Sequence, residues 1–133
     1  MPTVPQQGQR SRVGVVAAYA LVLVLAAELA VWGAFLVLLR VEGRPVPVGI
    51  AVAAAGNAAL ATAGGRVLRS RWGQVGPGVV WLLVALQLSE RRPEGDLIVL
   101  GGLRGLAFLV VGVVAVMAVL ARRPPTPEAT PDR

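Results

Sequence analysis

The sequence contains no cysteine and no histidine. Without cysteine the chain can form no disulfide framework and no thiolate nucleophile, and without histidine it has no imidazole for acid–base catalysis. Zinc and haem sites built on these two ligands are excluded for the same reason. No nucleophile with a nearby base is found in any apolar run, so we expect no enzymatic activity, no metal site and no cofactor.

Charge is also scarce, because only 15% of the 133 residues are charged while 56% are hydrophobic. A soluble domain of this size needs far more polar surface. All thirteen basic residues are arginines, and they form short clusters between apolar runs rather than one stripe. This distribution argues against nucleic-acid binding and favours contacts with lipid headgroups. The composition therefore predicts an integral membrane protein.

Four apolar runs, separated by charged or proline-containing turns, predict an all-α bundle of four transmembrane helices. The predicted spans are 13–39, 46–64, 72–88 and 103–121, within a transmembrane domain of residues 13–121. The polar residues 1–12 and the proline-rich residues 122–133 predict disordered tails. Gly64-Gly65 is expected to end the second helix, and residues 97–102 are expected to form an interfacial segment before the fourth.

Four spans place both tails on the same side of the membrane. Seven arginines flank the spans on the tail side, against four or five on the opposite side. Because arginine-rich segments stay in the cytoplasm, both termini are predicted to be cytoplasmic. The expected location is a bacterial plasma membrane.

Glu28 is the only acid inside a predicted span. It lies about 18 Å along its helix from Arg40, near the middle of a hydrocarbon core about 30 Å thick. A carboxylate at this depth is costly unless it is paired, hydrated or protonated, so Glu28 indicates either a functional site or an assembly contact. Asn57, at nearly the same depth on the second span, and Arg104 on the fourth are its candidate partners.

A different pairing of the first two helices follows from their small residues. The side of the first helix opposite Glu28 is small, and the second helix carries a run of alanines; the predicted packing residues are Ala26, Ala30, Ala34, Ala51, Ala55 and Ala59. Packing these faces together would bring the backbones close and turn Glu28 away from Asn57. The two arrangements compete, and the sequence leaves both open.

Several motifs carry a resemblance to a group of membrane proteins. AELAVWGAFL (27–36), PVPVG (45–49), SRWG (70–73) and RPEGDL (92–97) resemble small uncharacterised four-helix membrane proteins of GC-rich bacteria. The resemblance covers about residues 18–121. It implies a multi-pass membrane protein and carries no known activity.

The length, the four spans and the dipeptide Ala27-Glu28 resemble the small multidrug resistance transporters, which exchange protons for cationic drugs at such a glutamate as dimers. This resemblance implies a proton-coupled exporter with Glu28 as its site and Trp32 and Trp81 as substrate walls. The chain departs from that pattern at LAVW (29–32), where small hydroxyl residues are expected, and at 75–88, where an aromatic and glycine run is missing.

Taken from the residues alone, Trp32 and Trp81 are expected to serve packing or to anchor the helices at the membrane interface. The sequence therefore favours a non-enzymatic interaction or accessory protein of the bilayer. Its expected partners are a second copy of itself or a larger membrane protein. Export by a Glu28-dependent homodimer is the alternative.

Overall fold

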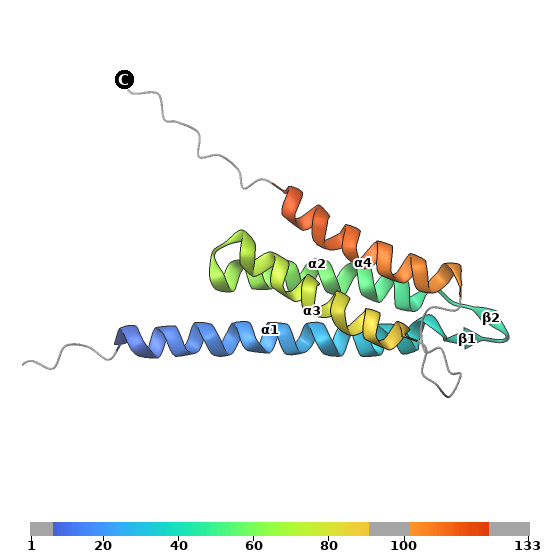
Figure 1. The fold of residues 1–133 in the computed structure, drawn as a ribbon, viewed down its shortest axis with the longest axis horizontal. Helices are drawn as coiled ribbons and strands as arrows, with labels where there is room; N and C mark the ends of the chain where they lie inside the picture. The colour runs from blue at the N-terminus through green and yellow to red at the C-terminus, as the bar shows by residue number, and fades with distance from the viewer. Residues whose placement is uncertain (1–6, 91–101, 123–133) are drawn as a thin grey trace, which may run out of the picture.

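The computed structural model describes residues 7–90 and 102–122, which form four helices and one short hairpin (Figure 1). The predicted all-α class is confirmed for these residues. The helices are α1 (Gln7–Val37), α2 (Val48–Leu68), α3 (Arg71–Ser89) and α4 (Leu103–Ala121). The strands β1 (Arg40–Val41) and β2 (Arg44–Pro45) pair antiparallel.

Three of these helices are long and apolar enough to cross a membrane, namely α1 over Ser11–Val37, α2 and α4. The shortest, α4, has 19 residues, which at about 1.5 Å per residue nearly matches the hydrocarbon thickness. Apolar helices of this kind indicate insertion in a membrane. Helix α3 also has 19 residues, but its apolar sequence is interrupted by Gln74, Pro77 and Gln87, and the predicted span over residues 72–88 is not confirmed as the fourth membrane crossing.

Helix α2 lies at the centre of the bundle and packs against the other three helices, whereas α1 and α4 hardly meet (Figure 1). Its sequence explains this position, because α2 consists mainly of alanine and glycine and can be approached closely from several sides. A hydrogen bond of 3.4 Å from the Tyr19 hydroxyl to the Gly73 carbonyl oxygen links α1 to α3.

A tight hairpin joins α1 to α2. Its two loop residues, Glu42 and Gly43, have φ of 51° and 77°, as two-residue hairpin loops of type I′ require. The ladder is extended by the Val46 N–H, which donates to the Leu39 carbonyl oxygen at 3.2 Å. Pro47 then precedes α2, which begins at Val48.

The predicted end of the second helix at Gly64-Gly65 is wrong. Helix α2 continues to Leu68 and is terminated by Arg69 in the left-handed conformation, with φ of 49° and ψ of 37°. Gly64 is needed inside the helix, because a Cβ there would overlap the carbonyl oxygen of Gly73 on α3. The glycine pair therefore permits close packing of α2 and α3 rather than capping.

The ends of α1 also differ from the prediction. The helix begins at Gln7, so residues 7–12 are helical rather than part of a disordered tail. Nucleation has already occurred in this long helix, and the glutamines and arginines of the segment are good helix formers that offset the lower propensity of Gly8. At the other end the N–H groups of Leu38 and Leu39 bond three residues back in a tightened turn, and α1 ends at Val37 rather than at residue 39.

The fourth helix runs over 103–121, as predicted. The predicted interfacial segment lies outside the described residues except for Gly102. Of the predicted tails, residues 1–6 and 123–133 also lie outside them.

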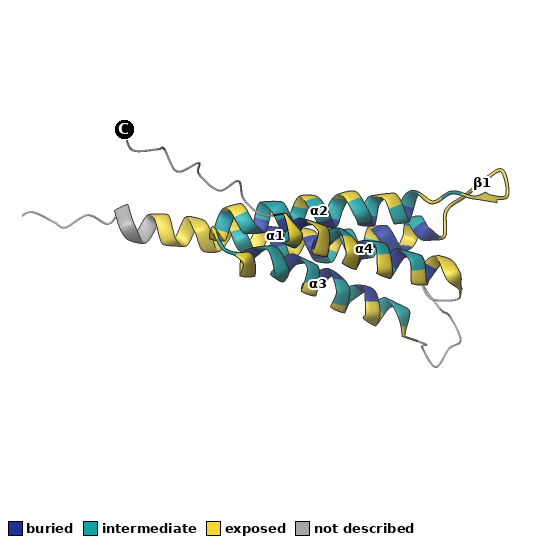
Figure 2. Cartoon of the chain, turned by 90° about the horizontal axis from the view of Figure 1, so that it is seen from above, coloured by how far each residue is buried: buried dark blue, intermediate teal, exposed yellow. Residues whose placement is uncertain are grey.

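The core consists of small side chains around two aromatic rings. Trp81 on α3 and Phe108 on α4 are fully buried, with ring centroids 5.1 Å apart. Gly112 makes room for them, because a Cβ there would overlap the Trp81 ring, and Gly33 does so for Phe108. Figure 2 shows that the buried positions lie between the helices and the exposed positions on the outside.

Candidate functional site

Helix α1 has two faces of different character. Its inward face carries Ala26, Ala30 and Ala34, each with 0% of its surface exposed. Its outward face carries larger side chains, and these are exposed. We call the following residues the outer α1 face: Leu21, Val24, Leu25, Glu28, Trp32 and Phe35. Their spacing of three or four residues places them on one side of the helix.

Glu28 lies in the middle of the outer α1 face and is exposed. It is about 13 Å along the helix from Val37, the last residue of α1, so it lies deep within a core about 30 Å thick. Within the described part of the chain no hydrogen bond or ion pair reaches its carboxyl group. The arrangement leaves this acid facing the region that lipid or a partner helix would occupy.

The anticipated Glu28–Asn57 pair is not formed. Asn57 is buried inside the bundle with 1% exposed, and its Nδ2 donates to the Ala53 carbonyl oxygen of the same helix at 3.0 Å. Its Oδ1 has no hydrogen-bond partner among the described residues. The small face of α1 packs on α2 instead: a Cβ on Gly49 would overlap the backbone and side chain of Val37. Close backbone packing therefore excludes the polar pair.

The packing residues predicted on the first helix are buried between the helices, whereas those predicted on the second helix lie outside the buried stripe. Ala51, Ala55 and Ala59 are exposed. The buried stripe of α2 lies on another side of the helix and consists of Gly49, Ala53, Asn57, Ala61 and Gly64. Glycine at both ends of this stripe lets the neighbouring backbones approach more closely than an all-alanine stripe would. These glycines were the sequence signal for the correct face.

The two tryptophans named as candidate substrate walls lie in different places. Trp32 shares the outer α1 face with Glu28, one helical turn away, and is 63% exposed. Trp81 is buried against Phe108, and its Nε1 has no hydrogen-bond partner among the described residues. The structure thus brings Glu28 and Trp32 together and keeps Trp81 in the core.

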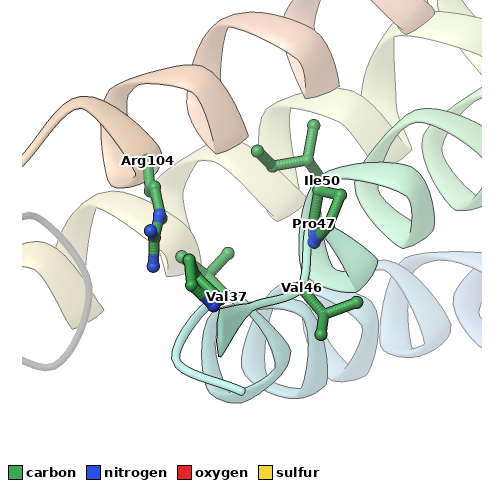
Figure 3. Close-up of a pocket in the computed structure, with 6 residues that line it drawn as sticks. Val37, Val46, Pro47, Ile50 and Arg104 are labelled. Carbon is green, nitrogen blue, oxygen red and sulfur yellow. The ribbon is translucent and has the colours of Figure 1, made fainter. Parts of the chain in front are cut away.

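Arg104 lies at the opposite end of the bundle from the start of α1 and the end of α4, away from Glu28 (Figure 1). It lines a cavity of about 270 Å³ between the start of α4 and the hairpin (Figure 3). We call this the end cavity; its walls are Val37, Pro45, Val46, Pro47, Ile50 and Arg104. Because Val37 is in the same wall, Arg104 is displaced along the bundle from Glu28 by roughly the same 13 Å. The second predicted partner is therefore not paired with Glu28.

The described residues offer little to metal chemistry. Within 7–90 and 102–122 no group of three acidic side chains could hold a metal ion. The candidate polar features are the exposed Glu28, the buried Asn57 and the end cavity with Arg104.

No curated protein and no solved structure matches the chain significantly. A family of unknown function (DUF6113) matches residues 3–133, almost the whole sequence, and the chain belongs to this family.

Proposed function

We propose that this membrane protein is a non-enzymatic interaction protein that self-associates in the bilayer through the outer α1 face, with Glu28 at the contact. The observation that carries the proposal is the exposure of Glu28 on a membrane-spanning helix. An acidic side chain near the centre of a bilayer is unfavourable by about 2.5–3.5 kcal/mol or more. A contact that covers and hydrogen-bonds this group therefore has a driving force within the bilayer.

A second copy of the chain supplies a partner of matching chemistry. A protonated carboxyl group has one O–H donor and one carbonyl acceptor, so two such groups can bond to each other in both directions. Two parallel copies related by a two-fold axis along the membrane normal would bring Glu28 to Glu28. In such a pair neither carboxyl group faces hydrocarbon.

The spacing of the apolar neighbours supports the same contact. Leu21, Leu25, Glu28, Trp32 and Phe35 follow each other at alternating steps of four and three residues, the spacing of a two-helix coiled-coil seam. All of them are exposed and are available to pack against a partner helix. A single polar residue in such a seam fixes register and oligomeric state, a role that suits Glu28.

We further propose that α3 crosses the membrane with the other helices. The contacts along α3 support this. Its start packs on Gly64, at the end of α2, while Trp81 packs on α4 farther along. The end cavity joins the start of α4 to Val37 and the hairpin, so α3 has to return the chain along the bundle. Four spans, with both termini in the cytoplasm of a bacterial cell, agree with the arginine distribution.

Cysteine cross-linking tests the contact directly, because the natural chain contains no cysteine. Leu25→Cys places a thiol on the outer α1 face beside Glu28, and Leu83→Cys places one at an exposed site on α3 as the matched control. With both variants in proteoliposomes at low protein density, oxidation should join copies of Leu25→Cys and leave Leu83→Cys monomeric. Equal cross-linking of the two variants, or none, overturns the proposed interface.

Substitution of Glu28 tests the role of the carboxyl group. Glu28→Ala should weaken dimerisation about three- to thirty-fold, the range expected for losing an interhelical hydrogen bond of about 0.6–2 kcal/mol. Glu28→Gln should retain most of the dimer, because a carboxamide also donates and accepts. Asn57→Ala removes a polar side chain that is buried inside the bundle and should leave the monomer–dimer equilibrium unchanged. Single-molecule photobleaching in proteoliposomes measures the dimer fraction.

The same samples distinguish the exporter alternative. Release of protons on addition of a hydrophobic cation, absent in Glu28→Gln, would replace the packing role with transport. An interaction protein should show no such release while its dimer persists.

A further inference from the structure

The end cavity combines one arginine with otherwise apolar walls among the described residues. Figure 3 shows Arg104 reaching from α4 across from Val37 and Ile50. We infer that this cavity binds the phosphate of an anionic phospholipid, with the guanidinium of Arg104 as the anion's partner. This inference does not depend on self-association through Glu28.

The chemistry of the walls leaves recognition to the arginine. Among the described residues that line the cavity none is acidic, and Pro45 and Pro47 have no backbone N–H to offer. The planar guanidinium can donate two parallel hydrogen bonds to a phosphate group. The apolar walls beside this contact can accept the glycerol and the first carbons of an acyl chain.

The position of the cavity matches the depth of lipid headgroups. It lies where α1 ends at Val37 and where α4 begins at Leu103. Arginines at the ends of membrane-spanning helices meet the headgroup region. A volume of about 270 Å³ is slightly below the range of small-molecule pockets. It would therefore hold a headgroup phosphate and its glycerol, with the acyl chains outside along the helices.

The start of α4 adds a second source of positive potential. Gly102, the residue before the helix, offers no side chain to cap the first N–H groups. The N-terminal end of a helix attracts anions through these free N–H groups and the helix dipole. Because Arg104 is the second residue of α4, the positive end of this helix dipole lies beside the cavity that Arg104 lines.

Lipid binding to the purified full-length protein tests the inference. Phosphatidylglycerol and phosphatidylcholine are added separately to the protein in detergent, and the bound lipid is counted by native mass spectrometry. Phosphatidylglycerol should bind preferentially. Arg104→Gln should weaken that binding about tenfold or more, as expected for losing charged hydrogen bonds. Arg40→Gln is the matched control, because Arg40 is exposed in the hairpin at the same end but does not line the cavity.

A second variant separates the cavity from a general charge effect. Ile50→Trp fills the apolar wall without changing any charge and should also weaken phosphatidylglycerol binding, while Arg104→Lys should weaken it less than Arg104→Gln. Circular dichroism shows whether each variant keeps its helices. Glu28→Ala should bind the lipid normally, which distinguishes this site from the proposed dimer contact.

Inorganic phosphate distinguishes the two sources of a phosphate group. If the cavity takes a lipid, phosphate in solution should not displace phosphatidylglycerol, because it gains nothing from the apolar walls. Displacement by inorganic phosphate would overturn the inference. Equal binding of the two lipids, or unchanged binding in both Arg104→Gln and Ile50→Trp, would do so as well.

Discussion

At the residue scale, Gly64 controls how closely α2 and α3 approach each other. A Cβ at Gly64 would overlap the carbonyl oxygen of Gly73, and a Cβ at Gly73 would overlap that of Gly64. Backbone atoms cannot move aside as a flexible side chain can. Gly64→Ala should therefore destabilise the bundle by about 1–3 kcal/mol, as overpacking does, measured as the free energy of unfolding in mixed micelles of increasing denaturing detergent.

The control for this substitution is Gly14→Ala in α1. Within the described part of the chain no atom lies within 4 Å of the position that a Cβ at Gly14 would occupy, and alanine is the better helix former by about 1 kcal/mol. Gly14→Ala should leave the unfolding free energy unchanged or slightly raised. Equal losses in the two variants would mean that the α2–α3 contact is not what Gly64 protects.

Also at the residue scale, the sequence could predict which residue of the candidate site matters but not which way it faces. Glu28 is recognisable because an acid in an apolar run is rare and energetically unfavourable. Its direction was not predictable, since α2 is small on nearly every side and accepts either face of α1. The contacts of Gly49 with Val37 and of Gly56 with Leu29 decide the rotation, and they exist only once the helices have packed.

At the scale of elements, Trp81 is a contact that joins α3 to α4. Its ring packs on Phe108 and fills the space left by Gly112. Trp81→Ala should lower the free energy of unfolding by about 3–5 kcal/mol, because it opens a large cavity between the two helices. Trp72→Ala is the matched control, since Trp72 is 81% exposed, and its effect should stay within about 0.5 kcal/mol.

The same detergent titration measures both tryptophan variants. A loss at Trp72 as large as that at Trp81 would show that the aromatic core does not hold α3 against α4. Far-ultraviolet circular dichroism before the titration checks that both variants begin with the same helix content.

Helix positions could be predicted from the apolar runs, but two kinds of feature could not. The extension of α1 back to Gln7 depends on helix propagation through polar residues that have no apolar pattern. The continuation of α2 past Gly64 and Gly65 depends on its contact with α3. Glycine in an apolar helix can either end the helix or let a neighbour approach, and only the packed partner distinguishes these roles.

At the scale of the whole molecule, the direction of each helix is tied to the number of spans. The hairpin and the start of α4 meet at the end cavity, while the α2–α3 turn lies at the other end of the bundle (Figure 1). If the four helices cross together, Leu68 and Ala121 lie on the side of the tails and Val41 lies on the opposite side. If α3 remained on one surface, Ala121 would lie with Val41 instead.

Single cysteines at Val41, Leu68 and Ala121 distinguish these topologies, because all three positions are exposed at the ends of described elements. In intact bacterial cells, a maleimide that cannot cross membranes should label Val41→Cys and leave Leu68→Cys and Ala121→Cys unreacted. All three should react after the cells are permeabilised, which controls for thiol accessibility. Labelling of Ala121→Cys together with Val41→Cys would mean three spans, and labelling of Leu68→Cys and Ala121→Cys without Val41→Cys would invert the bundle. The expected pattern follows from the arginines, whose modest excess on the tail side has to set the orientation of every helix at once.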